Sequence, residues 1–382
     1  MFKNRPIHIL QWLMGSLLML FFIACSSGED GDNRNVAHQP TLLTIYVYSP
    51  ERAVANQHSA LRRAEKGNVN SIGDESAIRS LQIWIYESES KAFVGYLNTE
   101  EVTTLNLGEG ATYQLPVSDD FAQRKPSVNV YVQANVTANN CGVDVLNDKT
   151  TYVELMDGAK ITTSKFGLGS LVSTVPDDGL PMAGMLTVQP VVGDAPALRV
   201  GTLNKVATVT LTRAVSKLRF VFAKTTGQPT VNISNITMNA EMIPTEEYLF
   251  KTPASMTYNE NVASMLTTAI TDVAETDDPT QYIYFNQEAQ AYENLINNAG
   301  LTVHGPIYLR ESNKKLAGVI TYKIGEGAVQ TADFQMQQAG DFLRNHTWII
   351  YAYYAGNGRL QVQSLYVKEW DNKEMDHNFY NW

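Results

Sequence analysis

The chain has 382 residues and a formal net charge of −10 at pH 7. This charge, without a basic cluster that could neutralise phosphates, argues against a nucleic-acid partner. The two cysteines exclude a disulfide framework, and the 19 tyrosines are typical of strand-rich chains, because aromatic side chains pack well on a pleated surface.

The start of the chain indicates a secretory signal. A short basic segment precedes an apolar run over residues 8–24, and Ala24 stands directly before Cys25. This start resembles a bacterial lipoprotein signal, in which the cysteine after the cut is acylated. We therefore predict a signal peptide over 1–24, lipidation of Cys25 and a polar tether over 25–40. A plain signal peptide or a single membrane anchor is the alternative.

The next part of the chain predicts short strands separated by turns and loops. The first strand covers residues 41–48, and the polar stretch 51–74 after it lacks apolar periodicity, which predicts an exposed loop. In the strand predicted over 78–86, aliphatic residues alternate with other types, so one face should be buried. Further strands are expected over 93–97, 112–117 and 128–136, with a short helix at 152–156.

A long alternating run over 207–222 follows. Its apolar parity changes, which predicts a bulge or bend near Arg213-Ala214. Residues 231–238 are expected as its hairpin partner. Gly356 and Gly358 predict a tight turn that joins two late strands, 348–354 and 360–367, in a hairpin. The remaining expectations are strands over 307–309, 316–324 and 331–336, and a short helix over 288–299.

The two parts share an outline of early paired strands, a loop-rich middle and a strong late strand. Many short strands with turn signals between them favour β-sandwiches over α/β layers. We therefore predict an all-β fold of two β-sandwich domains in tandem, with short helices in loops. The N-terminal domain is expected over residues 41–200 and the C-terminal domain over 201–382.

No arrangement of residues indicates catalysis. No Gly-rich phosphate loop precedes a helix, and the neighbours in the pair Glu246-Glu247 would point to opposite faces of a strand. Cys141 lacks a nearby histidine or basic cluster that would favour a thiolate. His346 stands just before a strand, where a structural role is expected. The sequence therefore predicts a protein that is not an enzyme and that has no cofactor and no metal site.

Arg62 and Arg63 suggest a different kind of site. They lie in the polar stretch after the strand 41–48, where an arginine-specific protease could cut. Loss of that strand would leave an apolar groove with unpaired backbone groups, which is a template for a strand of another chain. An ordinary solvated loop is the alternative.

Several motifs together resemble the fimbrillins of Bacteroidales, the FimA/Mfa-type pilus subunits. They occur in the family's order over nearly the whole chain, and they are the lipoprotein start at Cys25 and the segments 179–184, 209–219, 342–348 and 367–370. The resemblance implies two transthyretin-like β-sandwich domains and a lipid-anchored precursor at the cell outer membrane. It also implies arginine-specific proteolysis after the first strand and polymerisation by strand exchange at the cell surface.

For this chain, the resemblance implies cleavage at Arg62 or Arg63 and removal of the strand 41–48. The implied donor strand lies in the C-terminal segment and contains Leu360, Val362, Leu365, Val367 and Trp370. The implied function is that of a structural subunit of a fimbria that supports adhesion. Its partners would be other fimbrial subunits, the outer membrane through the lipid, and host or bacterial surface ligands.

Two alternatives to this function stay open on the sequence. The first is an uncut anchor or tip subunit of a fimbria. The second is a surface lipoprotein that binds glycans through exposed aromatic side chains such as Trp84, Tyr86 or Trp370.

Overall fold

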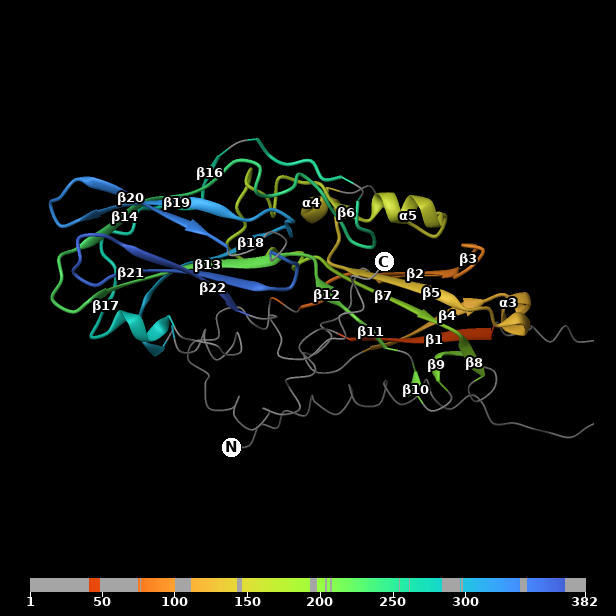
Figure 1. Ribbon diagram of the computed structural model, residues 1–382. Helices are drawn as coiled ribbons and strands as arrows, with labels where there is room; N and C mark the ends of the chain where they lie inside the picture. The colour runs from red at the N-terminus through yellow and green to blue at the C-terminus, as the bar shows by residue number, and fades with distance from the viewer. Residues whose placement is uncertain are drawn as a thin grey trace, which may run out of the picture. The chain divides into compact units, whose positions relative to one another are not determined.

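Short strands build most of the structure, a computed structural model of the chain (Figure 1). It describes residues 41–48, 75, 77–99, 111–142, 146–192, 198–202, 205–206, 208–253, 255–260, 262–283, 296, 298–336 and 342–367, which belong to one compact unit. The predicted signal peptide, Cys25 and the tether lie outside the described residues, as do Arg62, Arg63, Trp370 and most of the helix expected over 288–299. None of the helices described is long and apolar enough to cross a membrane.

Two sheets pack on each other in the N-terminal part. The first has six strands: β1 (Thr41–Tyr48), β4 (Ala111–Val117), β8 (Pro190–Val192), β9 (Leu198–Thr202), β10 (Lys205–Val206) and β11 (Thr208–Thr210). The second runs in the order β12 (Thr212–Arg213), β7 (Met182–Val188), β5 (Val128–Ala134), β2 (Leu81–Glu87) and β3 (Phe93–Thr99). Alternate aliphatic side chains of both sheets form one buried core, because successive residues of a strand face opposite sides.

The outer face of the second sheet is buried as well. Trp84, Tyr86 and Tyr131 project from it into another apolar cluster, which includes Leu155 of α5. The elements near this face are α4 (Ala138–Cys141) and α5 (Tyr152–Gly158), while α3 (Asp119–Arg124) follows β4. Helix α5 forms where the sequence predicts one, and a capping box between Thr151 and Glu154 begins it.

Two further sheets form the C-terminal part. One contains β17 (Glu275–Thr276), β13 (Ser216–Thr225), β21 (Thr347–Tyr354) and β22 (Gln361–Val367) in that order, with β18 (Thr302–Leu309) also paired to β13. The other contains β16 (Ala263–Ser264), β14 (Val231–Met238), β19 (Ala317–Ile324) and β20 (Val329–Gln335). Their facing side chains share a core that includes Phe220 of β13 and Ile233 of β14. A short 3-10 helix, η1 (Pro279–Tyr282), completes this part.

These paired sheets confirm the predicted all-β sandwich fold. The bend expected near Arg213-Ala214 is confirmed too, because the run 207–222 divides into β11, β12 and β13. The sheets of the N-terminal part include strands as far as Arg213, and the domain division near residue 200 stays a prediction.

The hairpin expected between the long run and residues 231–238 is wrong. Strand β13 pairs with β17, β18 and β21, whereas β14 pairs with β16 and β19 in the opposite sheet. The chain turns at Gly227, which has a φ of 78°, and crosses from one layer to the other. Alternation showed which residues face a core, but it does not specify whether the next strand lies beside or opposite. The late hairpin between β21 and β22 is confirmed.

Candidate functional site

Strand β1 lies in the interior of its sheet (Figure 1). It is antiparallel to β4, with Thr41 opposite Val117 and Val47 opposite Ala111 at the two ends. On its other side it runs parallel to β9 near Leu43 and to β11 at Tyr46–Tyr48. Both edges of β1 are therefore paired, and without this strand β4 and β11 would face each other across an empty slot.

The inner face of β1 closes the N-terminal core. Leu43, Ile45 and Val47 have no exposed surface, and they pack with aliphatic residues of the second sheet. Full burial of such a side chain stabilises a fold by roughly 1.5–3 kcal/mol. We call the slot between β4 and the β9–β11 side, with this apolar floor, the β1 groove.

After β1, the described chain resumes at Glu75, which is buried between the two parts of the molecule. Its carboxylate accepts hydrogen bonds from the Lys217 ammonium at 3.2 Å and from the Tyr308 hydroxyl at 2.6 Å. Its backbone carbonyl accepts a hydrogen bond from Arg213 Nε at 3.0 Å. Burial, with the Glu75 carboxylate as a second cause, raises the pKa of Tyr308 above its ordinary value, so its hydroxyl stays a donor.

The same place brings together two segments of the fimbrillin resemblance, 209–219 and 342–348. Arg213 Nη1 donates to Asn345 Oδ1 at 3.1 Å, and the Asn345 N–H donates to the Val215 carbonyl at 2.9 Å. The Lys217 N–H donates to the His346 carbonyl at 2.8 Å. We call Glu75, Arg213, Lys217, Tyr308 and Asn345 the joint cluster. Its members come from segments that lie far apart in the sequence.

The segment 179–184 of the resemblance fastens the start of β2. Asn135 Oδ1 accepts from the Arg79 N–H at 2.7 Å, and Asn135 Nδ2 donates to the carbonyls of Ala77 and Leu180 at 2.7 and 2.8 Å. Gly179 has a φ of 81°, and a Cβ there would collide with the Asn135 amide. The start of the body after the predicted cleavage loop is thus held at Glu75 by the joint cluster and at Ala77 and Arg79 by Asn135.

The predicted donor residues that the structure describes lie in or beside β22. Strand β22 pairs antiparallel with β21, with Val362, Leu365 and Val367 opposite Ala352, Ile349 and Thr347. Leu360 is buried, and its N–H donates to the Tyr322 hydroxyl at 3.0 Å. β22 is the last strand of its sheet in the part of the chain that the structure describes.

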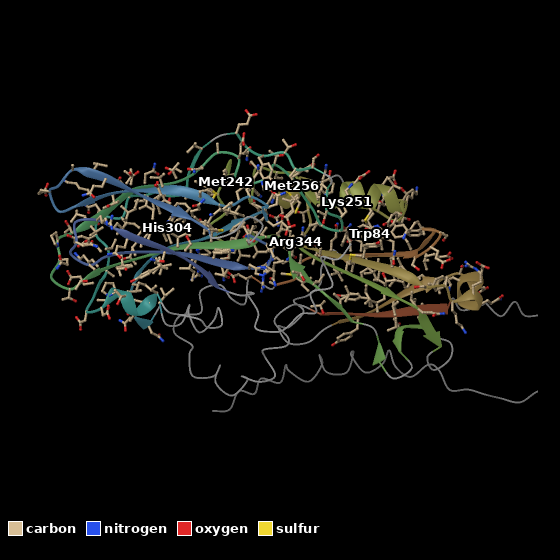
Figure 2. The ribbon with its side chains drawn as sticks, viewed as in Figure 1. Trp84, Met242, Lys251, Met256, His304 and Arg344 are labelled. Atoms are coloured by element: carbon tan, nitrogen blue, oxygen red, sulfur yellow. The ribbon has the colours of Figure 1, made fainter. Side chains whose placement is uncertain are left out.

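Two of the aromatic residues suggested for glycan binding, Trp84 and Tyr86, are not exposed. Trp84 and Tyr86 have no accessible surface, and they donate hydrogen bonds to the carbonyls of Asn147 and Thr150. The prediction that these two side chains bind glycans is therefore wrong. Alternation placed them on the outer face of β2, but it did not reveal that residues 146–158 cover this face. Figure 2 shows Trp84 among the side chains of this layer.

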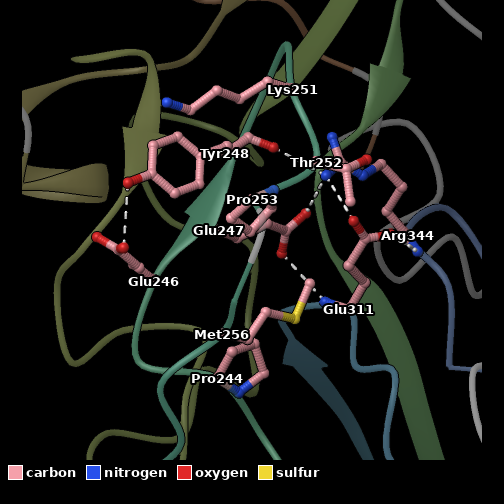
Figure 3. A pocket seen from close by; sticks show the side chains of 10 residues that line it. All are labelled: Pro244, Glu246, Glu247, Tyr248, Lys251, Thr252, Pro253, Met256, Glu311 and Arg344. Atoms are coloured by element: carbon pink, nitrogen blue, oxygen red, sulfur yellow. Dashed lines mark hydrogen bonds and ion pairs between the residues drawn. The ribbon is translucent and has the colours of Figure 1, made fainter. Parts of the chain in front are cut away.

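A small polar cavity lies beside the loop that follows β15 (Glu247–Tyr248), a strand paired with β6 (Lys160–Ile161) (Figure 3). Arg344 Nη2 lies 3.0 Å from Glu247 Oε1 and 2.7 Å from Glu311 Oε1. The cavity holds about 20 Å³, which is room for a single water molecule. Arg344 thus binds the carboxylates of both Glu247 and Glu311, which line this cavity.

Burial and charge act differently on these two glutamates. Burial raises the pKa of Glu247 from its ordinary value of 4.5 to about 8. Burial also acts to raise the pKa of Glu311, but the charge and hydrogen bonds of Arg344 outweigh it, and the pKa of Glu311 falls below its ordinary value. One ionised and one largely protonated carboxyl group thus share Arg344 at neutral pH.

Cys141 and the described acidic and histidine side chains were candidates for reactive or metal-binding groups. Burial raises the pKa of the Cys141 thiol to about 12, which keeps it protonated. Within the described ranges, no three His, Cys, Asp or Glu side chains are grouped so that they could hold a metal ion.

No family model matches this chain, and no curated protein does. The solved structures that resemble it include the following three. A proposed cell adhesion protein from Parabacteroides distasonis has 13% identity and a TM-score of 0.48, with 86% of this chain and 96% of that chain covered. A fimbrial assembly protein from the same species has 9% identity and a TM-score of 0.46 over 86% and 96% of the chains. The tip fimbrial protein Mfa3 from Porphyromonas gingivalis has 11% identity and a TM-score of 0.43 over 87% and 100%.

Proposed function

We propose that this chain is a structural subunit of a cell-surface fimbria, in which a strand of another subunit replaces β1. The supporting observation is the position of β1: an interior strand that a single stretch, residues 49–74, joins to the rest of the body. One cut in that stretch leaves β1 held without a covalent link to the body, by backbone pairing and by buried side chains that include Leu43, Ile45 and Val47. Pairing and packing of this kind can be exchanged for those of another strand.

The proposed cut is at Arg62 or Arg63. This cut separates both β1 and Cys25 from the body. We propose that Cys25 is acylated and anchors the precursor to the outer membrane. Glu75 lies on the other side of the cut, so the joint cluster stays with the body. Cleavage thus both opens the β1 groove to exchange and releases the subunit from its lipid.

The proposed donor is the C-terminal segment with Leu360, Val362, Leu365, Val367 and Trp370. Strand β22 belongs to the edge of its own sheet and pairs with β21 on one side. A strand that leaves an edge loses one ladder, whereas a strand that enters the β1 groove gains ladders with β4 and with the β9–β11 side. Once β1 has left, the donor strand restores the ladders that β1 had made and gives up only its single ladder with β21, and the apolar floor of the groove is buried again.

The test is the N-terminus of protein sheared from the cell surface. We expect mature subunits that begin at Arg63 or Ala64 and run as ladders resistant to SDS. The double variant Arg62→Gln/Arg63→Gln should keep Cys25 on the chain and lose the ladders. A matched control is Arg52→Gln, which changes an arginine of the same loop. Ladders whose subunits begin at an acylated Cys25 would contradict the proposal, and so would full ladders from the double variant.

A further inference from the structure

We infer that Glu75 is a positioning residue that holds the β11 wall of the β1 groove in place while β1 is exchanged. This inference rests on the proposed strand exchange. It assigns a role in that exchange to a buried ion pair between the two parts of the molecule.

Strand β11 depends on β1 for its backbone pairing. It is the last strand on its side of the sheet, and among the described strands its only ladder is with β1. When β1 leaves, β11 keeps the buried side chain of Val209 and its packing on β7, where a Cβ on Gly184 would lie 2.5 Å from the Thr210 carbonyl. It also keeps its covalent continuation through Leu211 and β12.

That continuation ends directly in the joint cluster. Arg213, three residues after the end of β11, has no exposed surface and donates to the Glu75 carbonyl and to Asn345. Glu75 is itself fixed by its carboxylate, which Lys217 of β13 and Tyr308 of β18 bind. The wall β11 is therefore tied, through Arg213 and Glu75, to two strands that β1 does not touch.

The negative charge of Glu75 strengthens its contact with Lys217. The side chains of Glu75 and Lys217 are 1% and 2% exposed, so each charge lacks water and needs the other. A buried charge that loses its partner is strongly unfavourable, whereas the pair together is tolerated. Thermal motion therefore cannot separate Glu75 from Lys217 without a large cost, and the Glu75 carbonyl stays in place for Arg213.

Strand β4, the opposite wall of the groove, provides an internal comparison. It also pairs with β1 and with no other described strand, but it leads into α3 and makes no described contact with Glu75. Loss of the Glu75 carboxylate should loosen β11 and leave β4 unchanged. A general loss of stability would loosen both.

The experiment compares Glu75→Gln with wild type and with Glu326→Gln, a glutamate whose side chain is fully exposed and binds Lys323. Each full chain is cut with an arginine-specific protease, and hydrogen exchange is measured over residues 208–211 and 113–117. Dissociation of a fluorescent peptide of residues 41–48 with a soluble lysine tag is measured in parallel. We expect Glu75→Gln to lose at least tenfold protection over 208–211 and to release the peptide at least tenfold faster, with 113–117 unchanged.

A second variant guards against simple misfolding. Glu75→Gln/Lys217→Met removes both charges of the pair, so Lys217 is not left buried without the Glu75 carboxylate, and the variant should fold and still lose protection over 208–211. Unchanged protection over 208–211 in both variants, or an equal loss over 113–117, would overturn the inference. If cut wild type fails to bind the peptide, the proposed strand exchange fails. The comparison of 208–211 with 113–117 in the uncut chain then still decides the role of Glu75.

Discussion

Arg344 binds the buried Glu247 and the partly buried Glu311, whose pKa values shift in opposite directions, and this makes stability depend on pH. In the folded chain, the pKa of Glu247 is about 8, against an ordinary value of 4.5 in the unfolded chain. Between these values the folded state keeps a proton on Glu247 that the unfolded state has lost. The contribution of Glu247 to the free energy of unfolding is therefore fully present below pH 4.5 and is lost as the pH rises toward 8.

The variant Glu247→Gln should remove this dependence. A single group contributes a slope of at most about 1.4 kcal/mol per pH unit, so the difference between wild type and variant is large enough to measure. We expect urea unfolding at pH 5, 6.5 and 8 to give a flatter profile for Glu247→Gln. The neighbouring Glu246→Gln is the control, because its partly exposed carboxylate pairs with Lys160 and its pKa is lowered. Equal slopes for wild type and Glu247→Gln would show that Glu247 does not titrate in this range.

At Gly184, the addition of a single carbon atom, a Cβ, should lower the stability of the fold. A Cβ at this position would lie 2.5 Å from the Thr210 carbonyl and 2.9 Å from Val209 Cγ1. Gly184→Ala must push β11 away from β7, and overpacking of this kind costs about 1–3 kcal/mol. We expect a lower midpoint of thermal unfolding than for Gly169→Ala, where the new Cβ would find ordinary contact at 3.5 Å. Equal midpoints would mean that β11 can shift without cost.

At the scale of elements, β1 differs from every other core strand. In the proposed function it is present in the precursor and absent from the assembled fimbria. Ile45→Ala should therefore act on the precursor alone. A buried Ile→Ala substitution costs about 2–5 kcal/mol, so urea unfolding of the uncut chain should shift by that amount. The heat resistance of SDS-stable ladders should not change.

Leu42→Ala is the matched control for Ile45→Ala, because Leu42 lies on the same strand but is only partly buried. It should have the smaller effect on the precursor. If Ile45→Ala weakened the ladders as much as the precursor, β1 would be part of the assembled subunit, and the proposed exchange would be wrong.

The sequence predicted the individual strands better than their partners. Strand-forming segments bounded by turn signals correctly indicated β1, β2, β5, β21 and β22, and the glycines at 356 and 358 correctly indicated the last hairpin. Alternation gives a strand two faces, but ladders depend on contacts between distant segments. For that reason the partner of β14 was wrong, and the cover over Trp84 was not foreseen.

The joint cluster was not predicted at all, although one signal for it exists. Arg213, Lys217 and Arg219 share one parity of a run that otherwise alternates like a core strand. Basic residues on a strand of this kind need buried acidic or polar partners. Glu75 gave no signal of a buried role, because it follows the polar stretch 51–74, in which glutamates are expected to be exposed. Only the folded chain brings it to Lys217.

At the scale of the whole described unit, the two sets of sheets are joined along several segments. Arg310 is buried, and it donates to the carbonyls of Pro244, Thr163 and Lys165. The small sheet of β6 and β15 and the third apolar cluster also connect residues of both parts. A mechanical force applied at the β1 groove is therefore transmitted to β13 and β21 through packed and hydrogen-bonded residues, and not through a linker.

Strand β1 has one more property, which is the direction of its neighbours. It is antiparallel to β4 and parallel to β9 and β11, so its slot has two unlike sides and distinguishes one end of an incoming strand from the other. A slot on one part of a molecule and a donor on another are different surfaces, and contacts between unlike surfaces produce open chains instead of closed pairs. Such a chain has a front and a back, and its growth stops at a molecule whose slot is already occupied. A copy that keeps its own β1 would be that terminus.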